Sequence, residues 1–178
     1  MKRTIICLLL LSLVLFSCKR SRKEMITGKW QAVKLENPDI DSFFIKSQIY
    51  IDTIGKGHDD ITNMRIYGVT NMDSVRHILQ EQYDSAKAIQ VASVTNTTFD
   101  FRKDSMLIIS FSGNLDSSKW YFNDAGELML DELSAYGPGD KIKIEIITLT
   151  DTVLKIKFVG NGSVSTVTFH PQGETPNP

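Results

Sequence analysis

The second half of the chain is the part of the sequence that most restricts the fold. From about residue 97, short runs of alternating apolar and polar residues are separated by turn segments such as 123–126 (Asn-Asp-Ala-Gly) and 160–162 (Gly-Asn-Gly). Alternation with a period of two is typical of strands that bury one face, and glycine and asparagine clusters end such strands. The pattern therefore predicts antiparallel strands joined by tight turns, and it argues against a fold of alternating strands and helices.

Seven strands are predicted in this region, and one more precedes it. The predicted strands are residues 28–35, 97–102, 105–111, 118–122, 127–130, 141–149, 153–158 and 164–170. Eight antiparallel strands suffice to close a small barrel, whose interior is either filled by side chains or holds one small ligand. Closure also leaves no exposed sheet edge. We therefore expect a mainly β protein, an eight-stranded antiparallel up-and-down barrel.

Residues 36–96 separate the first predicted strand from the other seven, and we expect a helical insertion there. Apolar residues recur at helical spacing over 74–90, and Asp73 is the expected N-terminal cap. Residues 39–54 fit either a helix or a strand, and we assign a helix. Within the polar segment 55–71, residues 61–67 are predicted to form a short strand.

The N-terminus has the pattern of a secretory leader. Two basic residues precede an apolar run at 5–16, which is shorter than the roughly 20 residues that a membrane-spanning helix needs. The run ends in Leu-Phe-Ser-Cys at residues 15–18, which resembles a bacterial lipobox. That resemblance implies a lipoprotein signal peptide at 1–17 and acylation of Cys18. The alternatives are an ordinary signal peptide, or a membrane helix, that happens to contain cysteine.

Charge is distributed unevenly behind this leader. The chain has 20 basic and 21 acidic residues, but from Glu24 onward the balance is 14 basic to 21 acidic, a net of −7. The other six cations lie before Glu24: Lys2 and Arg3 are in the leader, and four are in the predicted basic tether, 18–25, which either contacts the membrane surface or is a solvated linker. An acidic body at 26–170 and a proline-rich disordered tail at 171–178 follow. This balance argues against a nucleic-acid partner.

Several short motifs occur in the order found in a known group of proteins. Gly28-Lys29-Trp30 on the first strand resembles the Gly-x-Trp signature of lipocalins, and the whole chain is similar to small bacterial lipocalin-like (calycin-type) lipoproteins. The matching pieces are Cys18, 28–30, 99–104, 119–122 and 152–158. Unlike lipocalins proper, the last strand has no arginine and the chain ends without a helix. The resemblance implies a lipid-anchored barrel, but it does not carry over a ligand.

The alternation assigns one face of the predicted strands to the barrel interior. Those residues are Trp30, Phe99, Phe101, Trp120, Phe122, Leu128, Leu130, Ile142, Ile144, Ile146, Leu154, Ile156, Phe158, Val167 and Phe169. The candidate ligand-binding residues among them are Trp30, Phe99, Phe101, Trp120, Phe122, Ile144, Ile156 and Phe158. Two interpretations stay open, because the same large side chains line an apolar cavity or fill the barrel as a packed core.

No set of residues indicates catalysis or a metal site. Residues 58–60 (His-Asp-Asp) are oxygen-rich but lack the spacing of a calcium loop, so a solvated loop is the simpler interpretation. His77 and His170 lie in other elements and make no zinc motif. No nucleophile elbow or phosphate-binding glycine loop occurs. We therefore expect no enzyme activity, no metal and no cofactor.

A stripe of lysines is expected on the outer face of neighbouring strands. Lys141, Lys143, Lys155 and Lys157 alternate with apolar residues, and Glu145 interrupts them. The stripe either binds a polyanion or partner or is a solvated outer face.

Together these features favour a non-catalytic, lipid-anchored lipocalin-like lipoprotein of the cell envelope, at the periplasmic face of the outer membrane, which binds a small hydrophobic ligand. The alternative is a solid-core interaction protein that uses its outer face or the 36–96 insertion; its protein partner is unknown.

Overall fold

The computed structural model describes residues 20–134, 137–160 and 162–173. The predicted signal peptide, 1–17, and the predicted lipidation site Cys18 lie outside the described residues, as do residues 174–178 of the predicted tail.

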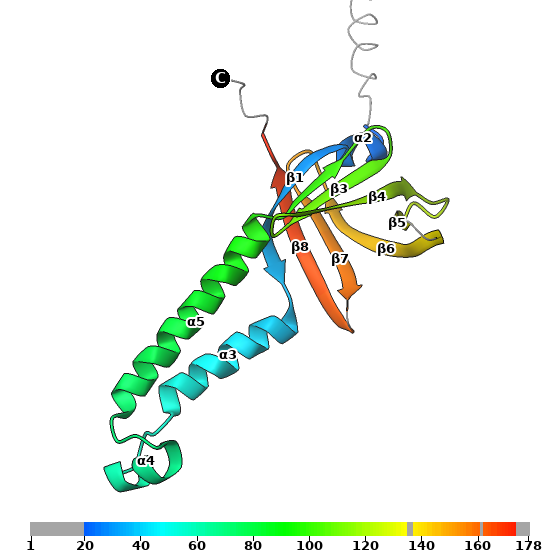
Figure 1. Ribbon diagram of the computed structural model, residues 1–178. Coiled ribbons are helices and arrows are strands. Elements are labelled where there is room, and N and C mark those ends of the chain that lie inside the picture. Colours follow the sequence, from blue (N-terminus) through cyan, green and yellow to red (C-terminus); the bar gives the residue numbers. More distant parts are fainter. Residues whose placement is uncertain (1–19, 135–136, 161, 174–178) are drawn as a thin grey trace, which may run out of the picture.

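Eight strands form the body of the protein (Figure 1). They are β1 (Gly28–Glu36), β2 (Thr98–Phe101), β3 (Met106–Phe111), β4 (Asn114–Phe122), β5 (Leu128–Ser134), β6 (Gly137–Leu149), β7 (Leu154–Gly160) and β8 (Ser163–Pro171). Each strand pairs antiparallel with its neighbours in sequence, and β8 pairs back with β1, so the barrel is closed. The prediction of a mainly β, closed, eight-stranded antiparallel barrel is confirmed.

The barrel core lies nearer to one end, which we call the closed end. It contains β-strand residues that alternate along the chain, as a pleated sheet with one buried face requires. The most deeply buried of them, each at most 3% exposed, are Trp30, Ala32, Phe101, Leu107, Trp120, Leu128, Leu154, Ile156 and Phe169.

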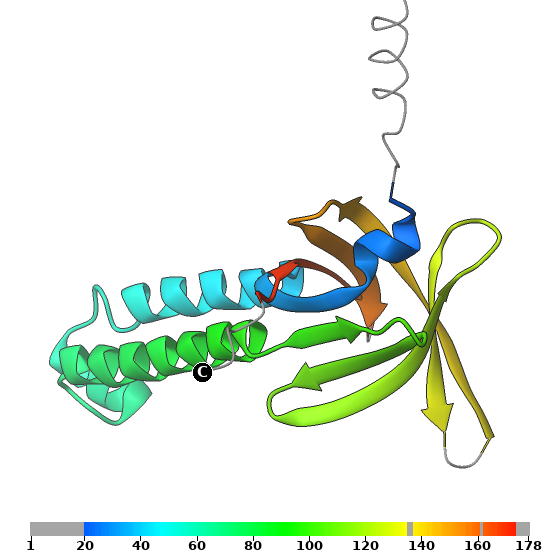
Figure 2. The same ribbon diagram turned by 90° about the horizontal axis from the view of Figure 1, so that it is seen from above.

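A short helix, α2 (Arg22–Ile26), covers the closed end (Figures 1 and 2). Ser21 and Glu24 form a reciprocal capping box at its start, which satisfies two backbone donors. Its last residue, Ile26, is fully buried, and the Ile26 carbonyl accepts a 2.8 Å hydrogen bond from the Trp30 indole. Burial of one isoleucine side chain contributes about 1.5–3 kcal/mol.

The basic residues around α2 bind the three turns at this end. The contacts are Arg20 to Asp151 at 3.1 Å, Arg22 to the Gly126 carbonyl at 2.7 Å, and Lys23 to the Ser105 hydroxyl at 3.3 Å. Residues 20–26, which include most of the cations of the predicted tether, therefore fold onto the barrel. Exposed ion pairs contribute about 0–1 kcal/mol each, so the burial of Ile26 is the larger effect.

Three helices follow β1 and precede β2 in the chain: α3 (Pro38–Thr53), α4 (Asp60–Tyr67) and α5 (Met72–Thr95). The helices α3 and α5 run antiparallel, side by side, and project from the barrel end opposite α2, with α4 at the tip (Figures 1 and 2). We call α3, α4 and α5 together the arm. The Phe44 and Tyr83 rings meet edge to face at 5.5 Å between the two long helices.

The side chain of Asn37 joins the arm to the barrel. Its Oδ1 accepts hydrogen bonds from the backbone of Asp39 and Ile40, both at 3.0 Å, and so caps α3. Its Nδ2 donates to the Ser165 hydroxyl on β8 at 2.9 Å, and the residue is only 8% exposed. One side chain thus fixes both the start of the arm and its attachment to the last strand.

The short strand predicted at 61–67 is wrong, because this segment is the helix α4. Asp59 caps it by accepting a 2.7 Å hydrogen bond from the Thr62 backbone, and Gly68 ends it in the left-handed conformation, at φ 73°. A cap at each end of eight residues satisfies backbone groups that an isolated strand would leave unpaired.

The predicted cap of the long helix α5 is also wrong by two residues. Asn71 is the N-cap and accepts a 3.2 Å hydrogen bond from the Ser74 backbone. Asp73 instead lies in the first turn, where it pairs with Arg76. Both positions favour an oxygen-bearing side chain, since the free backbone N–H groups give the first turn a positive potential. Among the residues that the structure describes, no helix combines the length and the apolar character needed to cross a membrane.

Candidate ligand-binding site

The open end of the barrel, beneath the base of the arm, contains an apolar cavity of about 530 Å³. The barrel contributes mainly Leu35, Phe99, Ile109, Phe111, Phe158 and Phe169 to its wall, and the arm contributes Ile40, Ala86, Ile89 and Val94. The polar side chains in the wall are neutral, namely Gln90, Ser93 and Thr97, and no ionisable side chain of the described residues lines it. Its volume lies in the range of about 300–1,000 Å³ that is usual for small-molecule sites.

Strand pairing brings the aromatic part of this wall together. Phe99 on β2 lies opposite Ile109 on β3, and both point into the barrel. The Phe99 and Phe169 rings are 4.8 Å apart at an angle of 45°. Because alternate residues of a strand share a face, Ile109 and Phe111 extend the wall of the barrel toward its mouth.

Below the cavity the barrel is filled. Phe101 and Trp120 are at most 1% exposed, and their rings meet edge to face at 5.4 Å. Each indole N–H has an acceptor, since Trp120 donates to the Arg102 carbonyl at 3.2 Å and Trp30 donates to the carbonyl of Ile26. With polar atoms satisfied and rings interlocked, this half is a packed core. The sequence left open whether the barrel holds a cavity or a packed core: the open half has a cavity and the closed half has a packed core.

The predicted ligand-binding residues are divided between these two halves. Phe99 and Phe158 line the cavity. Trp30, Phe101, Trp120, Ile144 and Ile156 belong to the buried core. Phe122 lies at the closed end, where the Arg22 guanidinium is 5.2 Å from the centre of its ring.

Sequence reasoning missed most of the arm's share of the wall and part of β3. The alternation of Leu107, Ile109 and Phe111 would have placed β3 residues inside the barrel. On α5, Ala86, Ile89 and later wall residues recur at spacings of three and four, which marks one helix face. That spacing shows that the face is apolar, but it contains no information about which part of the barrel it covers.

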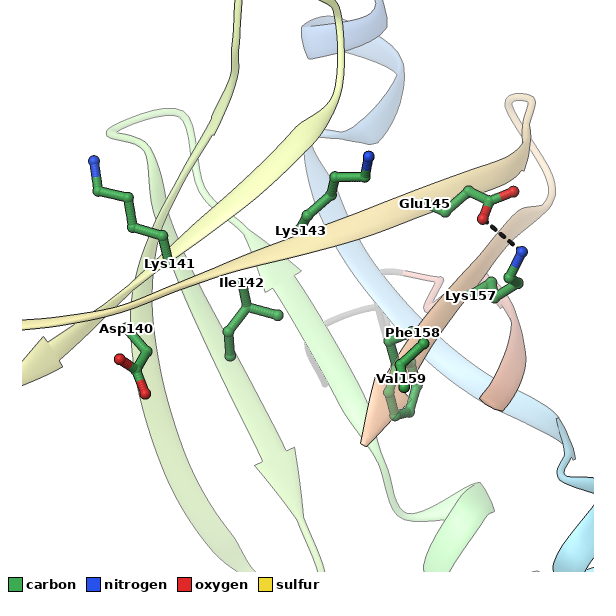
Figure 3. A pocket seen from close by; sticks show the side chains of 8 residues that line it. All are labelled: Asp140, Lys141, Ile142, Lys143, Glu145, Lys157, Phe158 and Val159. Carbon is green, nitrogen blue, oxygen red and sulfur yellow. Dashed lines mark ion pairs between the residues drawn. The ribbon is translucent and has the colours of Figure 1, made fainter. Parts of the chain in front are cut away.

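A second hollow, of about 500 Å³, lies where β6 and β7 diverge (Figure 3). The pairing of these strands starts at Glu145 and Lys157, whereas β6 residues before Glu145 pair only with β5. Ile142 and Phe158 line the hollow, and Phe158 also lines the apolar cavity. The divergence therefore opens the side of the barrel next to the cavity.

The predicted lysine stripe is largely paired with carboxylates. The pairs are Lys143 with Glu127 at 2.6 Å, Lys155 with Glu36 at 3.0 Å, and Lys157 with Glu145 at 2.6 Å. The hydrogen bond to Glu127 raises the pKa of Lys143, and those from Lys34 and Lys155 lower the pKa of Glu36. These pairs reduce the positive potential of the outer face and favour the interpretation of a solvated surface.

The acidic loop at 58–60 has a structural role in the described part of the chain. Asp59 caps α4, and its hydrogen bonds from Thr62 lower its pKa. His77 lies 3.8 Å from Glu81, with both side chains exposed. Within the described ranges, no three His, Cys, Asp or Glu side chains lie close enough together to hold a metal ion.

Comparison of this chain with models of protein families, with curated proteins and with solved structures finds no match.

Proposed function

We propose that this protein is a non-catalytic, lipocalin-like binding protein that holds a small apolar molecule at the open end of its barrel. The observation that carries the proposal is the cavity of about 530 Å³, with its apolar wall and neutral polar groups. The filled core below it supports the same function, because a rigid floor keeps the cavity from collapsing when empty.

Binding in such a site is driven by the removal of apolar surface from water. Each Å² of apolar surface buried contributes about 25 cal/mol, and a largely preformed wall limits the entropic cost of ordering side chains. The Phe99 and Phe169 rings supply flat contact area, and Gln90, Ser93 and Thr97 supply hydrogen-bonding groups to orient a ligand.

We further propose that Cys18 is acylated and holds the protein at the periplasmic face of the outer membrane. The leader pattern at 1–17 supports this, and so does the position of the described residues that follow it. Arg20, two residues after Cys18, pairs with Asp151 at the closed end. A lipid on Cys18 would therefore place the closed end toward the membrane and the open end away from it.

The ligand proposal is tested with full-length protein carrying Cys18→Ala and titrated with a fluorescent apolar probe. Ile109→Trp places a larger side chain in the cavity wall and should weaken binding about tenfold, as the loss of about two buried methylene groups would. Leu115→Trp is the matched control, because Leu115 is 75% exposed and does not line the cavity. Equal binding by both variants, together with no small molecule in native mass spectra, would contradict the proposal.

The anchor is tested by cell fractionation. The Cys18→Ala variant should move from the membrane fraction to the soluble periplasmic fraction. If it stays with the membrane, lipid is not the anchor.

A second candidate function is that of a cell-envelope interaction protein that uses the arm. Apolar side chains that line neither hollow of the barrel support it, since Ile45 is 62%, Ile61 80% and Ile78 54% exposed. Photo-crosslinking from position 61 in cells should then trap one partner reproducibly, whereas position 115 should not.

A further inference from the structure

The apolar cavity is not the only hollow on the arm side of the molecule. A groove of about 410 Å³ runs between α3 and α5, lined among others by Phe43, Phe44 and Tyr50 from α3 and by Leu79 and Tyr83 from α5. Phe43 and Tyr50 are 60% and 54% exposed, so aromatic surface of α3 beside the groove is accessible to solvent.

Ala86 connects this groove to the barrel. It is part of the wall of the groove and also of the cavity at the open end, so the two hollows meet at its small side chain. Along α5, the lining runs from Ser93 at the barrel mouth to Leu79 in the groove. These residues are 14 positions apart, which is about 21 Å at the helical rise of 1.5 Å per residue.

We call the cavity and the groove together the track, and its length along α5 favours a single extended chain. A hydrocarbon chain is flexible enough to lie along α5 and continue into the cavity, whose wall is mainly apolar.

The chemistry of the track differs between its two parts. The described cavity wall has no ionisable side chain, whereas Lys46 lines the groove together with Ser47, Gln82 and the two tyrosines. A ligand with one apolar and one anionic end would match this arrangement, with its chain in the barrel and its head group beside the Lys46 ammonium.

We propose that the ligand is a single-chain acidic amphiphile of the fatty-acid type, whose chain passes from the barrel cavity over Ala86 into the groove of the arm. The carboxylate lies beside Lys46, and the arm is thus half of the binding site. This inference rests on the proposed binding function and specifies its ligand class.

The continuity of the track is tested with Ala86→Trp in full-length protein carrying Cys18→Ala. The indole should block the junction, so the affinity for stearate should fall about tenfold, which is the effect of removing only two methylene groups from apolar contact. The affinity for octanoate, which is short enough for the cavity alone, should fall by a smaller factor than the affinity for stearate, because only stearate has to pass the junction. Ala88→Trp is the matched control, because Ala88 is exposed on another face of α5, away from both hollows.

The head-group position is tested with Lys46→Gln, and Lys56→Gln in the loop after α3 is the control. Lys46→Gln should weaken stearate binding about threefold at low salt, the scale of an exposed ion pair, and should leave the binding of stearyl alcohol unchanged. The difference between wild type and Lys46→Gln should shrink as ionic strength rises.

The outcomes separate this inference from the function on which it rests. If stearate and octanoate bind equally well and Ala86→Trp affects neither, the ligand uses the cavity alone: the inference fails while the proposed function stands. If no apolar probe binds and Ile109→Trp has no effect, the proposed function itself fails. If the wild-type protein is a dimer by light scattering and Ala86→Trp makes it a monomer, the groove is a protein interface and the inference is overturned.

Discussion

The two ends of the barrel are built from the same strands, but the interior is filled at one end and contains a cavity at the other. At the closed end, α2 inserts Ile26 among Trp30, Phe101 and Trp120, and the interior is filled. At the open end, only the base of the arm borders the mouth, and a cavity of about 530 Å³ is left. The comparison shows that a barrel of fixed strand number is hollow or solid according to what covers each end.

Strand pairing adds to the difference. At the closed end, β6 and β7 pair through Leu149 and Leu154, next to the tight turn that joins them. Toward the open end they separate beyond Glu145 and Lys157, so the barrel widens where the cavity lies. The closed end thus combines β6–β7 pairing with a packed core, whereas at the open end these two strands are not paired with each other.

The sharpest test of the comparison is truncation of a side chain at each end. Trp120→Ala should lower the free energy of unfolding by about 3–5 kcal/mol, because it leaves a large void in a rigid core. Ile89→Ala at the open end should change it by no more than about 0.5 kcal/mol, since Ile89 is 71% exposed. Denaturant unfolding measures both. Similar losses at the two sites would show that the open end is packed as well.

Truncation of the Ile26 side chain, by which α2 fills the closed end, should make that end resemble the open one. Ile26→Ala should cost about 2–4 kcal/mol, the usual range for a fully buried isoleucine. The same variant should take up xenon at the closed end, because the vacated space is small and lined by indole and phenyl rings, whereas wild type should not. Stability equal to that of wild type would mean that α2 is not part of the core.

The attachment of the arm should depend on one polar side chain. Asn37→Ala removes the cap of α3 and the hydrogen bond to Ser165, and it should cost about 1–2 kcal/mol. Hydrogen exchange should increase in the first turn of α3 and stay unchanged in α2. Ser42→Ala, an exposed residue of α3, is the control. If hydrogen exchange increased equally in α3 and in α2, Asn37 would stabilise the whole protein and not the attachment of the arm in particular.

The smallest expected effect is a pH dependence from surface carboxylates at both ends. Hydrogen bonds from Lys143 and Asn123 lower the pKa of Glu127, and those from Lys34 and Lys155 lower the pKa of Glu36. A carboxylate with a lowered folded pKa stabilises the protein above its ordinary pKa of 4.5, and this contribution is lost as pH falls through the folded value. Thermal unfolding between neutral pH and pH 3 should show this loss, and Glu127→Gln should reduce it. An unchanged profile in that variant would show that Glu127 makes no net contribution.

Most of the barrel could be predicted from the sequence because its signals are local. Alternation identifies a strand and glycine or asparagine ends it, so all eight strands were predicted, although β4 and β6 begin four residues earlier and β5 ends four residues later than predicted. The segment 61–67 was misassigned because its apolar residues fit either period, and the caps Asp59 and Gly68 decided for a helix. The cap of α5 was misplaced because Asn71 and Asp73 are both capping residue types only two positions apart.

The candidate site was predicted only in part, because it depends on contacts between distant segments. Phe99 and Phe158 were identified from alternation alone. The cavity's upper wall is formed by Ile89 and Val94 of the arm, whose position over the barrel mouth follows from the Asn37 joint and the packing of α5 on β1. Neither the hydrogen bond of Asn37 to β8 nor the packing of α5 on β1 produces a periodic pattern in the sequence.

The amino-acid pattern by itself determined many of the residues that face the barrel interior, since side-chain direction alternates along a strand except at bulges such as those in β1 and β6. It also determined how many strands are available to close the barrel. Only the tertiary structure decided which half of that interior is solid, because filling requires Ile26 to reach the rings of Trp30 and Trp120 from outside the sheet. Burial depends on which segments pack together in three dimensions, and a local sequence pattern does not show whether another segment fills the space between the strands.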